Sequence, residues 1–157
     1  MANEQTHKSN MNLTVKPYNC RGLNSSKKCY VVNLLLDCDF LFIQDHWLSS
    51  SQLNKLNFFS PNHYGVGVSG FGNDDFLRER PYGGCAILWR RDIRANVQTV
   101  TTDRRRVAAL RVGIVKLLFV NVYLPYEDSE ANLDDCNFQL SVVNSVIKQH
   151  QDCEIII

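Results

Sequence analysis

The stretch Phe40–Leu48, FLFIQDHWL, decides the fold class because it joins a buried strand to a polar turn. Its first four residues form a continuous apolar run, which is typical of a strand covered on both faces of its sheet. Gln44 and Asp45 follow, and residues just past the carboxyl ends of strands in α/β sheets commonly form binding sites. The sequence therefore predicts an internal strand over Phe40–Gln44 that delivers functional side chains to one edge.

Strands and helices alternate on both sides of this stretch. Further strands are predicted at Leu13–Tyr18, Tyr64–Val68, Gly84–Trp89, Ala95–Val100, Val107–Val112, Lys116–Tyr123 and the aliphatic run that ends at Ile157. Pro17 lacks a backbone donor and places the first strand at an edge or makes it irregular. A first helix is predicted from Ser25 or Ser26 to Leu36. A second begins at Ser49, Ser50 or Ser51, with Leu53, Leu56 and Phe59 facing inward. A third covers Asn132–His150, with Phe138, Val142, Val146 and Ile147 facing inward. This mixture indicates a mixed α/β sheet protein.

Length and charge bound the possible functions. The 157 residues fit one domain, and a net charge of +1 gives no overall attraction to nucleic acid or membranes. We expect the arginines of two groups, Arg104–Arg106 and Arg90, Arg91 and Arg94, to be solvated loop charges. Residues 1–11 are polar and aperiodic, so we predict a disordered leader followed by a domain over residues 12–157.

The six cysteines favour free thiols in a reducing, intracellular compartment, nuclear or cytoplasmic. The amino terminus is polar and does not resemble a signal peptide, and no apolar run reaches the roughly 18 residues that span a bilayer. Zinc-type cysteine and histidine spacings are absent, as are the glycine-rich signatures of nucleotide-binding loops. These patterns argue against a membrane partner and against a small-molecule cofactor.

Four short segments place polar residues where apolar strands give way to loops: Tyr18–Leu23, Ile43–Leu48, Tyr82–Leu88 and Asn121–Pro125. Each is weak alone, because Asn19 suits a turn, Asp45 a loop carboxylate and Tyr123 a half-buried aromatic. Since strand ends in such sheets converge on one crevice, the residue types taken together indicate a common site.

In this order the segments resemble the endonuclease/exonuclease/phosphatase superfamily, in particular the endonucleases of LINE-type retrotransposons. The matching motifs are Asn19-Cys20-Arg21-Gly22-Leu23, Gln44-Asp45-His46-Trp47-Leu48, Gly83-Gly84-Cys85-Ala86-Ile87 and Asn121-Val122-Tyr123-Leu124-Pro125. The resemblance implies a mixed-sheet α/β sandwich. In the family the strand matched by Ile155–Ile157 runs into Gly-Asp-Phe-Asn, and a later Ser-Asp-His motif carries the general base. We therefore expect a fold that is incomplete at its C-terminal half.

The resemblance also implies roles for the matched residues. Asp45 would bind Mg²⁺ or Mn²⁺, Asn19 would support the metal and a phosphate, and Tyr123 would position the scissile phosphate. The partner would be DNA, and the missing half or another protein would complete the fold. His46 is expected to be non-catalytic, and Asp45 stands where the family has Glu.

The resulting interpretation is a truncated metal-dependent phosphodiesterase domain that is inactive alone. A non-catalytic nucleic-acid-binding protein, a decayed remnant, or a phosphatase-like member of the same superfamily are the alternatives.

Overall fold

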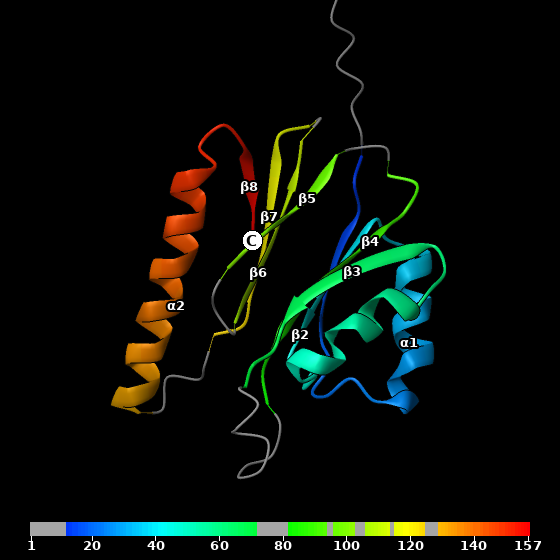
Figure 1. The fold of residues 1–157 in the computed structure, drawn as a ribbon, viewed down its shortest axis with the longest axis horizontal. Coiled ribbons are helices and arrows are strands. Elements are labelled where there is room, and N and C mark those ends of the chain that lie inside the picture. The colour runs from blue at the N-terminus through cyan, green and yellow to red at the C-terminus, as the bar shows by residue number, and fades with distance from the viewer. Residues whose placement is uncertain (1–11, 72–81, 94–95, 103–105, 114, 125–128) are drawn as a thin grey trace, which may run out of the picture.

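A computed structural model of the chain describes residues 12–71, 82–93, 96–102, 106–113, 115–124 and 129–157. Within these residues two four-stranded sheets pack face to face, and helices cover their outer faces (Figure 1). This four-layer arrangement is the mixed α/β sandwich that the sequence predicts. Among the described helices, none has both the length and the apolar character needed to cross a membrane.

The first sheet carries most of the motif segments. Its strands lie in the order β1-β2-β4-β3. They are β1 (Val15–Asn19), β2 (Phe40–Gln44), β3 (His63–Val68) and β4 (Cys85–Arg90). Strands β1 and β2 are parallel, while β4 is antiparallel to both β2 and β3. The parallel pair is joined by helix α1 (Ser25–Leu36), and the 3₁₀ helix η1 (Ser50–Phe58) connects β2 to β3. Pro17 therefore lies in an edge strand, where its missing donor costs no ladder bond.

The second sheet has the order β5-β6-β7-β8. Its strands are β5 (Val97–Val100), β6 (Val107–Val112), β7 (Leu117–Val122) and β8 (Glu154–Ile156). The first three strands are antiparallel, and β8 is parallel to β7 after a crossover through helix α2 (Glu130–Gln149). In Figure 1, α2 lies against the outer face of this sheet, and α1 lies on the opposite side of the molecule.

Alternation along β2 explains its continuous apolar run. Phe40 and Phe42 face the second sheet, where the ring centroids of Phe40 and of Phe119 on β7 lie 4.3 Å apart. Leu41 and Ile43 face the other way and pack in the cluster beneath α1. All four side chains are buried, as expected for a strand covered on both faces.

Several sequence expectations need correction. Asn24, not Ser25 or Ser26, caps α1, because its side chain accepts the amide of Lys27. The second helix is 3₁₀, and only Leu56 of its predicted inward residues is fully buried. Phe138 is 43% exposed because α2 buries Cys136 and Gln139 instead, whereas Val146 is buried as predicted.

The remaining outcomes concern strand burial, the leader and the cysteines. Strand β2 is buried on both faces and β7 is mostly buried, whereas Ile155 and Ile156 of β8 are half-buried and Ile157 is 64% exposed. The predicted disordered leader, residues 1–11, lies outside the described residues. All six cysteines are free thiols.

Candidate functional site

Asp45 follows β2 directly and turns its carboxylate into the protein. Its backbone has a positive φ of 57°, which re-aims the side chain at the strand end. One carboxylate oxygen, Oδ1, accepts hydrogen bonds from the Gly83 amide at 2.7 Å and from the indole Nε1 of Trp47 at 2.8 Å. Asp45 is 8% exposed, so these charge-assisted bonds fix a buried acceptor in one orientation.

Asn19 ends the neighbouring strand at the same edge. It is the last residue of β1, pairs in register with Gln44, and its side chain accepts the amide of Arg21 at 3.3 Å. The turn that follows is bound to Asp45, because the amide of Gly22 donates to the Asp45 carbonyl at 2.7 Å. A Cβ at Gly22 would lie 2.3 Å from the ring of Trp47, so only glycine fits this approach.

Tyr123 approaches the same region from the second sheet. It follows β7, and its amide donates to the carbonyl of Arg106 at 3.0 Å. Burial raises the pKa of Tyr123, the negative charge of Asp45 raises it further, and the cations Arg106 and Arg21 lower it. Gly83 lies between Tyr123 and Asp45, because a Cβ at Gly83 would lie 3.9 Å from the Tyr123 ring and the Gly83 amide donates to Asp45 at 2.7 Å. Asn19 ends the strand that pairs with β2, directly beside Gln44.

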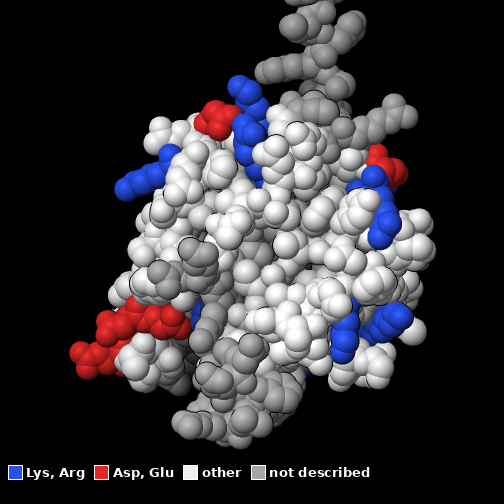
Figure 2. All heavy atoms as spheres, viewed as in Figure 1, with Lys and Arg blue, Asp and Glu red and all other residues white. Residues whose placement is uncertain are grey.

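Arg106 is a site residue that the sequence did not predict. Its side chain is 14% exposed, forms an ion pair with Asp135 of α2 at 3.1 Å, and lies 5.7 Å and 5.9 Å from the ring centroids of Tyr123 and Tyr82. The expectation of a solvated charge was wrong for this arginine. Figure 2 shows acidic side chains gathered over the first turns of α2, which contain Glu130, Asp134 and Asp135.

Asn121 holds the two sheets together beside the site. Its side-chain amide donates to the carbonyls of Ile43 at 2.8 Å and Ala86 at 2.9 Å, and its oxygen accepts from Gln44 at 3.0 Å. The residue is 1% exposed. It thus fixes the strand that precedes Asp45 relative to the strand that precedes Tyr123. An amide in the otherwise apolar run LLFVNV is the signal that could have revealed this role.

His46 follows Asp45 and turns its ring toward the backbone of Gly84. It is fully buried, its Nδ1 accepts the amide of Leu48 at 2.9 Å, and a Cβ at Gly84 would lie 2.4 Å from its ring. Burial lowers the pKa of His46 to about 4, so the ring is neutral at physiological pH.

The oxygen donors at this end fit a magnesium ion in kind. Mg²⁺ binds in proteins through one or two carboxylates together with waters and phosphate oxygens, and Asp45 and Asn19 offer one carboxylate and one amide oxygen. No cluster of three or more His, Cys, Asp or Glu side chains exists within the described part of the chain. The two neighbouring strand ends thus offer two protein oxygen donors of the kind that Mg²⁺ accepts.

The profile of the endonuclease/exonuclease/phosphatase family matches residues 18–145, and the chain belongs to this family, whose members are typically metal-dependent. Curated protein sequences give no match.

Solved structures share the fold at low sequence identity. A 3′ phosphatase from Neisseria, bound to a product DNA hairpin, is 20% identical with a TM-score of 0.62, over 90% of this chain and 53% of that chain. An AP endonuclease from Archaeoglobus fulgidus is 16% identical with a TM-score of 0.60, over 88% of this chain and 52% of that chain. An AP endonuclease from Leishmania major is 11% identical with a TM-score of 0.62, over 93% of this chain and 51% of that chain. The chain thus spans about half the length of these structures.

Proposed function

We propose that this chain supplies part of the active site of a metal-dependent phosphodiesterase that acts on DNA, of the type found in LINE retrotransposon endonucleases. The observation that carries the proposal is that Asp45, just after β2, and Tyr123, just after β7, both lie against Gly83, while Asn19 ends the strand paired with β2. Phosphodiester hydrolysis needs neutralised phosphate charge and a stabilised leaving oxygen, and a divalent cation with hydrogen-bond donors suits both tasks.

Each residue has a defined task in this proposal. Asp45 and Asn19 hold the magnesium ion, which when bound neutralises negative charge on a phosphate oxygen. The hydroxyl of Tyr123 donates a hydrogen bond to the phosphate, and its raised pKa keeps the hydroxyl protonated at neutral pH. The guanidinium of Arg106 adds positive charge beside the Tyr123 ring.

The carboxylate at position 45 limits the affinity for metal. The LINE-type sequences carry Glu at this position, and Asp is shorter by one methylene. The Oδ1 atom of Asp45 is already engaged by Gly83 and Trp47, which holds the carboxylate close to the backbone. Because Mg²⁺ requires near-octahedral geometry, we expect weak binding that Asp45→Glu strengthens.

Paramagnetic Mn²⁺ tests the site directly. We expect substoichiometric Mn²⁺ to broaden the backbone NMR signals of Asn19, Asp45 and Tyr123, and Asp45→Asn to abolish the effect. Asp92 is the matched control, because it is an exposed carboxylate that pairs with Arg90 far along β4. Broadening around Asp92 with none around Asp45 would overturn the metal assignment.

Cleavage is a separate question. We expect residues 1–157 to leave supercoiled plasmid intact in the presence of Mg²⁺, because the described site has one carboxylate and its neighbouring histidine, His46, is buried and neutral. A single positioned acid–base group contributes roughly 10²–10⁴-fold to rate. Plasmid nicking that requires Mg²⁺ and disappears in Asp45→Ala would refute this expectation.

DNA binding without cleavage is the second candidate function. The single carboxylate found among the described residues of the site favours it, and it predicts an affinity that falls steeply with salt while plasmid stays intact.

A further inference from the structure

A cavity of about 520 Å³ adjoins the candidate site on the side of α1 and η1. It is lined by Gly22, Leu23, Asn24, Ser25, Lys28, His46, Trp47, Leu48, Gln52, Lys55, Phe58 and Phe59. Trp47 connects the two places, because its ring lines the cavity while its Nε1 donates to Asp45 at 2.8 Å. A molecule in this cavity therefore contacts the Trp47 side chain, whose indole also binds the carboxylate that we assign to the metal.

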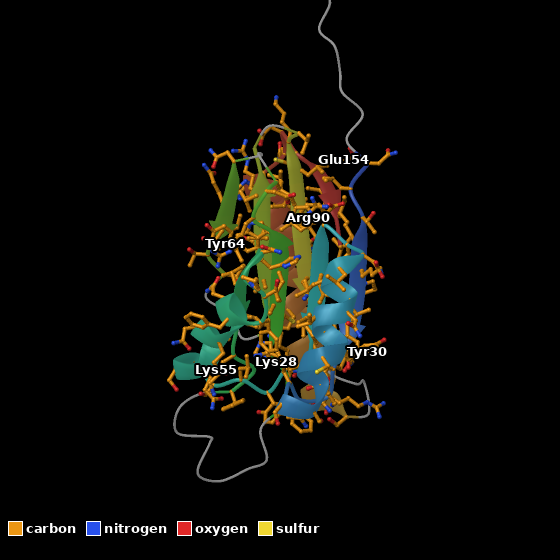
Figure 3. All side chains as sticks on the ribbon, turned by 90° about the vertical axis from the view of Figure 1, so that its right-hand side faces the viewer. Lys28, Tyr30, Lys55, Tyr64, Arg90 and Glu154 are labelled. Carbon is orange, nitrogen blue, oxygen red and sulfur yellow. The ribbon has the colours of Figure 1, made fainter. Side chains whose placement is uncertain are left out.

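The cavity is positively charged. Lys28 of α1 and Lys55 of η1 are exposed, and Figure 3 shows them at the same end of the molecule. Among the described residues neither lysine forms an ion pair, and no acidic side chain lines the cavity. The first turn of α1 also contains no acidic residue. This end of the chain thus offers two unneutralised ammonium groups to an anion.

The cavity is also aromatic. Phe58 is 75% exposed, and Trp47 and Phe59, which are half-buried, line the same cavity. Aromatic rings beside cationic side chains form the usual platform for single-stranded nucleic acid, since each base stacks through its face while lysines follow the phosphates. A base inside a duplex is already stacked and does not present that face.

We propose that this cavity holds an unpaired nucleotide of a DNA strand whose neighbouring phosphate lies at the Asp45 site. This inference rests on the proposed function and narrows its substrate to single-stranded or locally unpaired DNA. The base stacks on the exposed Phe58 ring, and Lys28 and Lys55 contact the adjoining phosphates.

Fluorescence of Trp47 reports on the cavity. The chain has two tryptophans, and Trp89→Phe leaves Trp47 as the single indole. In this background and with EDTA present, we expect a short oligothymidylate to quench Trp47. Phe58→Ala should weaken binding roughly 5- to 150-fold, which corresponds to the loss of one stacked base.

The lysines are tested through the salt dependence. The double variant Lys28→Ala/Lys55→Ala should reduce the slope of log K against log salt by about 1.4, the value for two lost contacts to a single strand. Lys16→Ala/Lys148→Ala removes the same charge away from the cavity and should leave the slope unchanged. Equal slopes for both double variants would overturn the proposal.

Two further arms separate the alternatives. Duplex DNA that quenches Trp47 as strongly as the single strand, or inorganic phosphate that displaces the oligothymidylate at similar concentration, would each refute an unpaired nucleotide. Because the titration uses EDTA, it is independent of the metal. Quenching of Trp47 without Mn²⁺ broadening at Asp45 would refute the proposed function and support the nucleotide cavity. Broadening at Asp45 without quenching of Trp47 would refute the nucleotide cavity and support the proposed function.

Discussion

Acidification should destabilise this protein through His46, because the ring is buried in its uncharged form. The side chain is fully buried, its Nδ1 accepts the amide of Leu48, and its ring packs against the backbone of Gly84. Burial lowers the pKa of His46 from 6.5 to about 4. Protonation in the folded state would place a charge where water has no access.

The sign and size of the effect follow from these two pKa values. Above pH 6.5 the ring is neutral in both states, so the stabilisation is fully present. As the pH falls from 6.5 toward 4, the unfolded chain binds a proton that the folded chain does not, and the free energy of unfolding decreases. At about pH 4.5 the loss reaches about 2.5 kcal/mol, a large part of a typical total of ~5–15 kcal/mol.

Urea denaturation at a series of pH values between neutrality and pH 4.5 measures the loss. His46→Asn is the informative variant, because an amide oxygen can still accept the Leu48 amide but does not titrate. We expect it to be less stable at neutral pH and to show a flatter pH dependence. His63→Asn should also flatten the pH dependence, because burial lowers the pKa of His63 as well. If His46→Asn lost as much stability on acidification as the unmodified chain, the reasoning would be refuted.

Two other substitutions probe the site. Asn121→Leu should lower the free energy of unfolding by about 2–5 kcal/mol, because the buried carbonyls of Ile43 and Ala86 each lose a donor. Urea denaturation measures this loss. The control variant Asn144→Leu, on the exposed face of α2, should change the free energy of unfolding little. Arg106→Met should raise the pKa of Tyr123, because the guanidinium lowers it, and NMR titration of ring-labelled tyrosine would detect the shift. Arg106→Lys keeps the charge and should shift it less, whereas an unchanged pKa in both variants would contradict the assigned contact.

Strand β2 was predictable because both of its faces are buried. Such a strand needs an unbroken apolar sequence, and the observed bounds, Phe40–Gln44, agree with the prediction. The helices were less predictable. On α2 the pattern placed Val146 correctly, and the predicted Val142 and Ile147 also pack against the sheet, but Phe138 is 43% exposed. The prediction of the inward face therefore failed only near the start of the helix, where Cys136 and Gln139 are buried instead.

The candidate site was also predictable only in part. Motif order predicted that Asn19, Asp45 and Tyr123 lie at strand ends, since local sequence determines where strands stop. The bonds that orient Asp45 were not predictable, because the Gly83 amide is 38 residues away along the chain. Arg106 was misjudged for a related reason. Its partner Asp135 belongs to α2, and the contact depends on how that helix packs against β6 and β7.

Asn121 also affects the strand register with which the two sheets pack together during folding. Phe119 and Asn121 point toward the first sheet, whereas Leu118 and Val120 point toward α2. A slip of one residue in the pairing of β7 would exchange these faces and carry the amide away from its carbonyl acceptors. In a misaligned pairing the carbonyls of Ile43 and Ala86 would be buried without a donor. Asn121 therefore favours the native register when the two sheets pack together.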